Sequence, residues 1–221
     1  MFKSVSAVLI TVIALLSLCL GPAAAAKNRD RDERAERILA VTEGKNKGVR
    51  DFRVRFRAHV ICMGMRIPLT GEFMFKRPDK IRVRFDNMPA FLSGYKRLFK
   101  GLAPSGTAYG AATRTFVREE EARGGTLWLI RITPSKDDPK KNIRETYLWI
   151  NRKTHNPDLC KVIYRDGSSV ETENSFPPGS GRTLPASQKA ALKSGMFHAK
   201  AFIRYGPYKI NGGLSDDLFR D

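Results

Sequence analysis

Apolar and polar residues alternate along three segments in the first half of the chain, at 51–62, 71–76 and 80–85. A period of two places successive side chains on opposite faces of a β-strand, so each segment is predicted to be a strand. A Lys-Arg-Pro turn at 76–78 joins the second to the third, which indicates an antiparallel hairpin. The apolar face of these strands contains Phe52, Val54, Phe56, Phe73, Phe75, Ile81, Val83 and Phe85. The opposite face is basic and contains Arg53, Arg55, Arg57, Arg82 and Arg84.

The pattern changes to a helical period between Pro89 and Pro104. At about 100° per residue, the apolar side chains fall within an arc of roughly 120°, which predicts a short amphipathic helix. Such a helix can pack on a core, cover a cavity as a lid or contact a membrane surface. Its apolar face contains Phe91, Leu92, Tyr95, Leu98, Phe99 and Leu102, and its basic face contains Lys96, Arg97 and Lys100.

The rest of the chain predicts short strands separated by turns such as Gly124-Gly125 and Asp166-Gly167. Helices are predicted at 30–40 and 186–194, and strands at 113–118, 126–133, 143–150, 159–164, 169–174 and 199–205. Together these elements predict an α+β fold that is mostly antiparallel β. No linker is long enough to divide it into two domains.

The first 26 residues have the pattern of a secretory signal peptide. A positive start at Lys3 precedes an apolar stretch at 6–20, and small residues at 22–26 provide a cleavage region. The apolar stretch is short for a membrane span, which favours cleavage and export over an uncleaved membrane anchor. The mature protein is then predicted to begin at about Lys27, with residues 27–221 forming one domain.

The composition is strongly basic, with 40 Lys and Arg residues against 22 Asp and Glu and a formal net charge of +18. Such a surface attracts anionic partners, for example membrane head groups, glycolipids or acidic proteins. Predicted export argues against nucleic acid as the partner. Charge alone does not choose among the others.

Two cysteines, Cys62 and Cys160, remain after the predicted cleavage. In an oxidising compartment they can form one disulfide. Both are predicted to point inward from strands, so two buried thiols are an equally good expectation.

The sequence lacks the patterns of known catalytic and metal sites. The histidines His59, His155 and His198 are isolated in sequence, and no Cys-x-x-Cys pair occurs. The tripeptide at 179–181 does not satisfy the Gly-x-Ser-x-Gly pattern of a hydrolase nucleophile. We therefore expect a protein that is not an enzyme and that uses no metal or cofactor.

The hairpin at 71–85, with its Lys76-Arg77-Pro78 corner, resembles the signature of the periplasmic outer-membrane lipoprotein carrier family, the LolA type. Further similarity lies at 147–151, at Asp166-Gly167 and in the closing 208–219 stretch. This resemblance implies an unclosed, curved β-barrel whose concave side is covered by helices and binds acyl chains.

The resemblance also implies roles for residues. The apolar strand face named above, together with Phe91, Tyr95, Leu98 and Phe99, would bind lipid. Arg77 would control a lid by holding it closed through hydrogen bonds. The basic strand face, with Lys96 and Arg97, would dock on an anionic membrane or an envelope protein.

The predicted function is therefore that of a monomeric periplasmic carrier, which binds lipid acyl chains and moves them toward the outer membrane. Two departures from the family leave the cargo open between a lipoprotein and another lipid: the Pro89–Pro104 segment replaces a usual hairpin, and residues 176–198 look like an insertion. Two other functions remain possible: an envelope lipid sensor or regulatory module of the same fold, and a basic protein that binds an anionic polymer. From the residues alone, the apolar face can equally fill a solid core.

Overall fold

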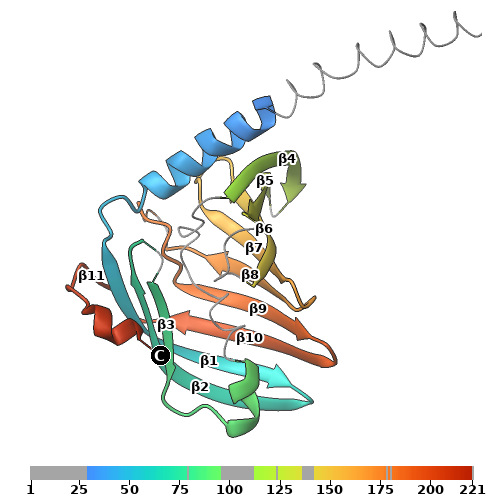
Figure 1. Cartoon of the computed structure of the whole chain (residues 1–221). Coiled ribbons are helices and arrows are strands. Elements are labelled where there is room, and N and C mark those ends of the chain that lie inside the picture. The colour runs from blue at the N-terminus through green and yellow to red at the C-terminus, as the bar shows by residue number, and fades with distance from the viewer. Residues whose placement is uncertain are drawn as a thin grey trace, which may run out of the picture.

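The computed structural model describes residues 29–78, 80–95, 112–122, 124–135, 142–177, 179 and 181–220. Within these ranges the chain forms one α-helix, at 29–44, and a single strongly curled antiparallel sheet (Figure 1). No helix in the described ranges combines the length and the apolar character needed to span a membrane.

The elements follow one another in a simple order. The strands are β1 (Asp51–Cys62), β2 (Met65–Lys76), β3 (Lys80–Phe85), β4 (Ala112–Ala122), β5 (Gly125–Pro134), β6 (Ile143–Asn151), β7 (Pro157–Tyr164), β8 (Ser169–Ser175), β9 (Ser187–Ser194), β10 (Phe197–Tyr205) and β11 (Lys209–Ile210). Two short 3₁₀ segments, η1 (Ala90–Tyr95) and η2 (Asp216–Phe219), follow β3 and β11.

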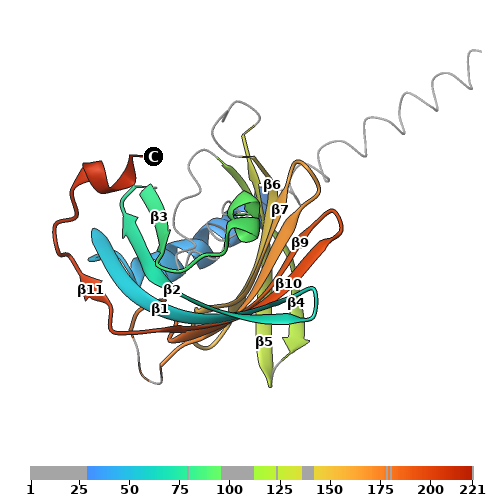
Figure 2. The same ribbon diagram turned by 90° about the horizontal axis from the view of Figure 1, so that it is seen from below.

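The sheet runs in the order β3-β2-β1-β10-β9-β8-β7-β6-β5-β4, and the short β11 pairs with β1 beside this path. In the described part of the chain β3 and β4 are its two edges, so the sheet curls without closing on itself (Figure 2). The helix lies on the concave side. This arrangement confirms the predicted fold class of an unclosed, curved and mostly antiparallel barrel, with one helix on its concave side.

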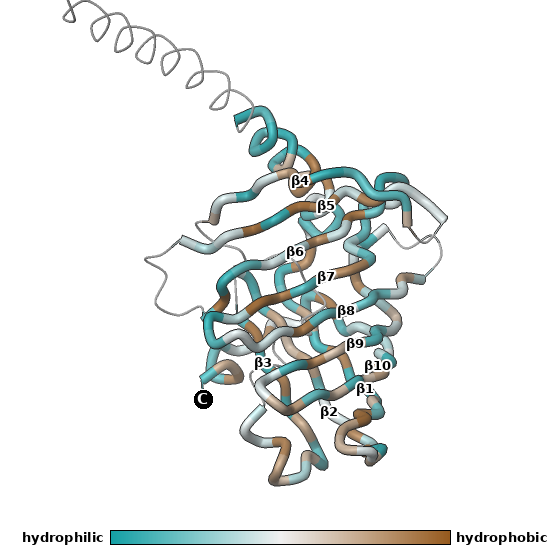
Figure 3. Tube along the Cα trace, turned by 90° about the vertical axis from the view of Figure 1, so that its right-hand side faces the viewer, coloured by the Kyte–Doolittle hydropathy of each residue, from teal (hydrophilic) through white to brown (hydrophobic). Residues whose placement is uncertain are grey.

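The alternation along β1 determines which side chains enter the core. From Arg53 to Cys62, every second residue of β1 is buried and the residues between them are exposed. The pairing with β2 places Phe52 opposite Phe75 and Val54 opposite Phe73, as the predicted hairpin requires. Figure 3 shows the strands as one continuous ladder from β4 to β2, with hydropathy that changes along each strand.

The structure corrects one predicted helix and describes only the start of another. Residues 187–194 form strand β9, which lies between β8 and β10 in the sheet, so this segment is not a helix. For the same reason the stretch at 176–198 is not a simple insertion, since it supplies a strand near the middle of the sheet. The predicted Pro89–Pro104 helix begins with η1, and its residues 96–104 lie outside the described residues.

Gly71 allows an unusually close approach between β2 and its neighbours. A Cβ atom at this position would lie 2.2 Å from the carbonyl oxygen of Arg84 and 2.7 Å from a ring carbon of Phe56. Both contacts are far shorter than van der Waals distance, so only glycine fits here without movement. Gly71 therefore lets β3 and the Phe56 ring pack directly on the backbone of β2.

Candidate functional site

The helix covers one half of the concave face and forms a compact apolar cluster with it. Ala35, Ile38 and Leu39 of the helix are at most 7% exposed. They pack against the inward side chains of β4, β5 and β6, which are Phe116, Ile130, Ile132, Leu148 and Ile150. This half of the concave face is solid core.

Polar contacts anchor the same helix to the edge strand β4. Arg34 forms an ion pair with Glu119, and its guanidinium carbon lies 3.8 Å from the centre of the Phe116 ring. Two further contacts come from β4, where Arg114 Nη1 lies 2.8 Å from Glu36 Oε2 and Thr115 Oγ1 donates to Asp32 at 2.8 Å. The N-terminal half of the helix is therefore held to β4.

The other half of the concave face is formed by β1, β2, β3 and β10. Here Phe52 packs on Phe73 and Phe75, with ring centres 6.0 and 5.3 Å apart, and on Tyr208 at 5.4 Å. Phe52, Phe73 and Phe75, together with Val54, are at most 2% exposed. Four of the predicted lipid-binding residues thus belong to a tightly packed aromatic cluster.

A small apolar cavity lies beside this cluster. It is lined by Phe56, Ala58, Val60, Leu69, Phe73, Val83, Phe85, Ala201, Ile203 and Tyr205. Its volume of about 20 Å³ is enough for roughly one water molecule. Of the predicted lipid-binding residues, the structure places Phe56, Phe73, Val83 and Phe85 on this cavity, while Phe52, Val54, Phe75 and Ile81 are not part of its lining.

The lining also contains residues for which the sequence suggested no binding role. Ala201, Ile203 and Tyr205 come from β10, the direct neighbour of β1. Their alternation along 199–205 predicted a strand, but only the pairing of β10 with β1 places them opposite the hairpin. The hydroxyl of Tyr205 donates to Gln188 Oε1, and burial raises the pKa of Tyr205.

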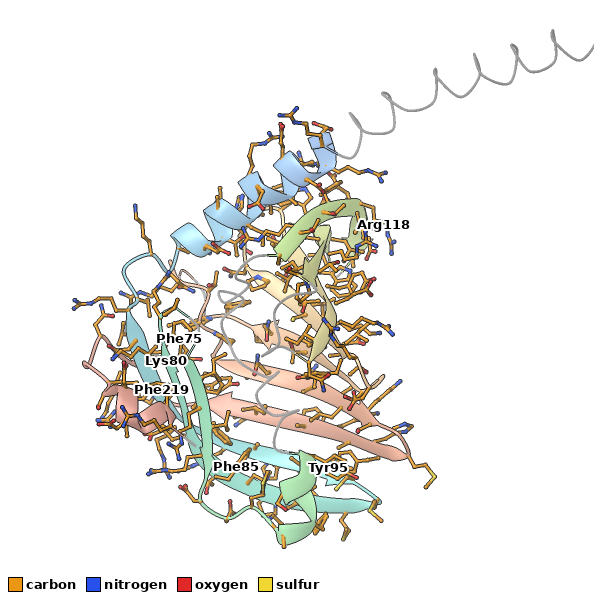
Figure 4. The ribbon with its side chains drawn as sticks, in the orientation of Figure 1. Phe75, Lys80, Phe85, Tyr95, Arg118 and Phe219 are labelled. Carbon is orange, nitrogen blue, oxygen red and sulfur yellow. The ribbon has the colours of Figure 1, made fainter. Side chains whose placement is uncertain are left out.

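Among the described residues, the segment η1 covers this half. Leu92 is completely buried in the same apolar cluster as the cavity lining, whereas Phe91 is 50% exposed. Tyr95 stacks on Phe197 of β10 with ring centres 3.8 Å apart, and in Figure 4 Tyr95 and Phe85 lie toward the same end of the β2–β3 hairpin. The structure thus turns Leu92 toward the core, and leaves Phe91, which the sequence pattern places on the same apolar face, half exposed. The remaining predicted residues of this segment, Lys96, Arg97, Leu98 and Phe99, lie outside the described residues.

Arg77 joins the β2–β3 corner to the loop that follows the helix. Its Nε donates to the carbonyl oxygen of Val49 at 2.7 Å, and its Nη2 donates to that of Asn46 at 2.9 Å. Asn46 is itself buried and bonds to the backbone and side chain of Thr183. Arg77 therefore holds the chain between helix and sheet, and its bonds go to this loop rather than to η1.

The basic convex face contains two kinds of arginine. In the described part of the chain, Arg53 and Arg57 are exposed and form no side-chain hydrogen bond or ion pair. By contrast, Arg55 Nη2 lies 2.8 Å from Asp86 Oδ2, and Arg84 Nη2 lies 3.8 Å from Glu72 Oε2. Of these four arginines, only Arg53 and Arg57 are fully available for an external anion.

Arg82, a predicted docking residue, has a structural role on the same face. Its Nη1 donates to the carbonyl oxygens of Leu218 and Arg220, at 2.6 and 2.9 Å, and so holds the C-terminal segment against β3. Lys80 on β3 and Phe219 on that segment lie close together in Figure 4. The sequence pattern correctly separates the two faces but does not reveal that the C-terminus returns to cover part of one.

Asp216 reinforces this contact. Its carboxylate oxygens lie 2.6 Å from the Nζ of Lys76 and 2.7 Å from that of Lys80. Hydrogen bonds from these two ammonium groups lower the pKa of Asp216 to about 2. The edge strand β3 is thus held from the convex side by charge-assisted bonds.

Cys62 is buried and Cys160 is half-buried, and no disulfide joins them. Among the described residues, no three His, Cys, Asp or Glu side chains gather as metal ligands would.

At the level of sequence, no protein-family profile and no curated protein matches the chain. Its structure is similar to several solved structures. One is a domain assigned to outer membrane lipoprotein sorting from Vibrio parahaemolyticus, with a TM-score of 0.61, 12% identity, and coverage of 86% of this chain and 97% of that one. A DUF1329 family protein from Desulfovibrio piger gives a TM-score of 0.59 and 11% identity, with the same coverage of 86% and 97%.

A third structure, a LolA superfamily protein from Nitrosomonas europaea, gives a TM-score of 0.56 with 10% identity, covering 85% of this chain and 97% of that one. At such low identities the similarity defines the fold and leaves the cargo open. The protein thus has a LolA-like fold, as the hairpin signature predicted.

Proposed function

We propose that this protein is a non-enzymatic periplasmic carrier that binds lipid acyl chains between β1–β3 and β10. The observation that supports this best is the cavity, whose lining is apolar except for the hydroxyl of Tyr205. A wall of this kind suits an acyl chain because each buried methylene contributes about 0.8 kcal/mol and needs no directional partner. The cargo would be the acyl chains of a lipoprotein or of another lipid.

The cavity must enlarge before a chain can enter. Its volume is about 20 Å³, whereas pockets that hold small molecules typically measure about 300–1,000 Å³. The edge strand β3 provides a place for this expansion, because Ile81, Val83 and Phe85 are only half-buried. We infer that lipid enters beside β3 as η1 moves away.

Leu92 contributes a modest part of the free energy needed for this movement. Withdrawing the buried Leu92 from the core costs about 1.5–3 kcal/mol, which the burial of roughly two to four methylenes offsets. A long acyl chain carries several times that number of methylenes. Cargo binding can therefore drive the opening without any external energy source.

The predicted signal peptide supports the periplasmic setting. A segment with the pattern of the first 26 residues would direct the protein out of the cytoplasm. One structurally similar protein is assigned to outer membrane lipoprotein sorting, which fits this setting. The proposed carrier would move its cargo toward the outer membrane and act as a monomer.

Binding of a fluorescent long-chain fatty acid, measured with Val83→Asp, tests the proposal. Val83 lines the cavity from an edge strand, so a carboxylate there would repel an acyl chain while leaving the half-exposed position tolerable for folding. We expect affinity to fall at least about tenfold, since one charge buried against the chain costs more than about 1.4 kcal/mol. Val41→Asp is the matched control, because Val41 is 51% exposed on the helix.

Equal binding by the wild type and Val83→Asp would contradict the proposed site. Mass spectrometry of solvent extracts from protein purified from its host should also identify a co-purified lipid. A carrier further transfers that lipid between two vesicle populations, whereas a sensor retains it with a protein partner. An anionic-polymer binder would contain no lipid at all.

A further inference from the structure

Two neighbouring hairpin turns carry the most exposed large apolar side chains in the described part of the chain. Met63, in the β1–β2 turn, is 80% exposed, and Met196, in the β9–β10 turn, is 101% exposed. Because β1 pairs with β10 and Cys62 lies opposite Ala199, the two turns lie side by side at one end of the sheet. Figures 1 and 2 both show the two tips projecting together.

The backbone of the β1–β2 turn does not favour methionine. Cys62 pairs with Met65, so the loop has two residues, and Met63 and Gly64 have φ values of 50° and 74°. These are the values of a type I′ turn, in which Asn, Asp or Gly is preferred at the first position. An apolar side chain is therefore held at a tip where local geometry favours a polar residue, and such a strained position points to a role outside the fold.

The β9–β10 turn also places a methionine at its tip, with a different backbone conformation. Ser194 pairs with Phe197, which leaves Gly195 and Met196 as the loop. Gly195 adopts the positive φ of 57° at the first position, as in a type II′ turn, and Met196 occupies the second. Both tips thus end in a methionine, a flexible and unbranched apolar side chain.

The apolar character continues onto the adjoining convex face. Ile61 is 38% exposed, and Phe202 of β10 is 44% exposed. The register pairs Ile61 with Lys200 and His59 with Phe202, so the two apolar side chains are diagonal neighbours. We define the tip surface as Ile61, Met63, Met65, Met196 and Phe202.

Cations flank the tip surface. Ile61 lies between Arg66 of β2 and Lys200 of β10, and Lys193 lies opposite His198 beside the second turn. In the described residues the side chains of Arg66, Lys193 and Lys200 are exposed and form no ion pair. Exposed apolar groups surrounded by unpaired cations are the composition that binds at the interface of an anionic bilayer.

We propose that the tip surface docks this protein on an anionic lipid bilayer. The methionines enter the interfacial region, and Arg66, Lys193 and Lys200 contact lipid phosphates. A second copy of the chain is a poorer occupant, because a symmetric contact would bring the same cations face to face. This docking site is separate from the acyl-chain cavity and does not depend on it.

One consequence does rest on the proposed function. Phe197 directly follows Met196 and stacks on Tyr95 of η1. Docking through the tips therefore brings the segment that covers the cavity close to the bilayer, where an acyl chain would be collected or delivered.

Flotation of the mature protein with vesicles tests the docking surface. The wild type should bind vesicles of phosphatidylglycerol and phosphatidylethanolamine, should not bind pure phosphatidylcholine vesicles, and should be released by high salt. Met63→Ser/Met196→Ser should lower the partition coefficient about tenfold. Arg66→Glu/Lys193→Glu/Lys200→Glu should lower it at least about a hundredfold, since each cation at the surface contributes roughly fivefold and each new carboxylate is repelled by the anionic lipid.

Matched controls separate this site from a general effect of charge or hydrophobicity. Arg37→Glu/Lys47→Glu/Lys153→Glu makes the same change in net charge at exposed positions away from the tips, and Val41→Ser/Leu218→Ser removes exposed apolar groups there. Both controls should bind anionic vesicles nearly as well as the wild type. In Met196→Trp, the fluorescence should shift to the blue on binding and should be quenched by brominated phospholipid.

Absence of binding to anionic vesicles would overturn the proposal. So would tip variants that bind as well as the controls, or a dimer that dissociates in Met63→Ser/Met196→Ser while vesicle binding is unchanged. If Val83→Asp loses fatty-acid binding but still docks on vesicles, the docking proposal stands. If the protein binds fatty acid but does not dock on anionic vesicles, only the docking proposal is rejected.

Discussion

The concave face of the sheet is covered in two different ways. Over β4–β6, the helix at 29–44 buries three apolar side chains and is fixed to β4 by two ion pairs and a hydrogen bond. Over β1–β3 and β10, the described cover is the short η1, which contributes one completely buried residue, Leu92. The concave strand faces in the two halves are similarly apolar, so the difference lies in how firmly the helix and η1 are attached to them. We infer that the first half provides stability and the second half can open.

The largest effect expected from this comparison is on stability. Leu39→Ala should destabilise the protein more than Leu92→Ala. Leu39 sits in the solid half, so its removal should lower the free energy of unfolding by about 4 kcal/mol. Leu92 lies beside half-buried residues that can close the gap, so its loss should cost only about 2 kcal/mol. Urea denaturation measures both values.

The same two variants should differ in binding. Leu92→Ala makes opening easier and should raise the affinity for a fluorescent fatty acid, while Leu39→Ala should leave it unchanged. Equal losses of stability with no change in affinity would show that both halves are permanent core.

A smaller effect is expected at the junction of the two halves, in Arg77→Leu. The variant loses two hydrogen bonds to the loop after the helix and should be destabilised by about 1–2 kcal/mol. It should also change the rate of lipid loading or release, because the loop connects the helix to β1. Arg53→Leu is the control, since Arg53 has no partner in the described residues, and it should stay within about 0.5 kcal/mol of the wild type. Unchanged transfer between membranes would remove Arg77 from the mechanism.

The smallest effect concerns the ion pairs of Asp216, which hold the edge strand β3 from the convex side. The folded pKa of Asp216, about 2, is below its ordinary value of 3.8. Its contribution to stability is therefore complete above about pH 4 and is lost as the pH falls toward 2. Titration of the Asp216 carboxyl carbon by NMR should show a midpoint near 2 in the wild type. A midpoint near 3.8 would show that Lys76 and Lys80 do not hold it in solution.

The sequence was most informative where a single period decided the structure. Strand β1 matches its predicted bounds, because its alternation is unbroken and one side is buried. Residues 187–194 were misassigned because Ala, Lys and Leu favour helix, yet Gln188, Ala190 and Leu192 also alternate. Pairing with β8 and β10 overrides the local preference for helix.

The remaining differences depend on contacts that no local pattern contains. The predicted arc of the Pro89–Pro104 helix assumes 100° per residue, whereas a 3₁₀ segment turns by about 120°. Leu92 therefore points inward, while Phe91, predicted on the same face, is 50% exposed. Arg82 bonds to residues at the far end of the chain, more than a hundred positions away. The alternation of side chains along a strand also cannot show how much space is left between the inward ones, so the size of the cavity had to come from the structure.

The missing side chain at Gly71 determines more than local packing. An added methyl group would collide with the carbonyl of Arg84 and with the ring of Phe56, and would push the edge strand β3 away from β2. The absence of one carbon atom thus lets β3 and Phe56 pack closely on β2, beside the proposed path of entry for lipid. Substitutions of increasing size at Gly71 would therefore change the spacing between β2 and β3 in steps, and with it the width of the proposed entrance.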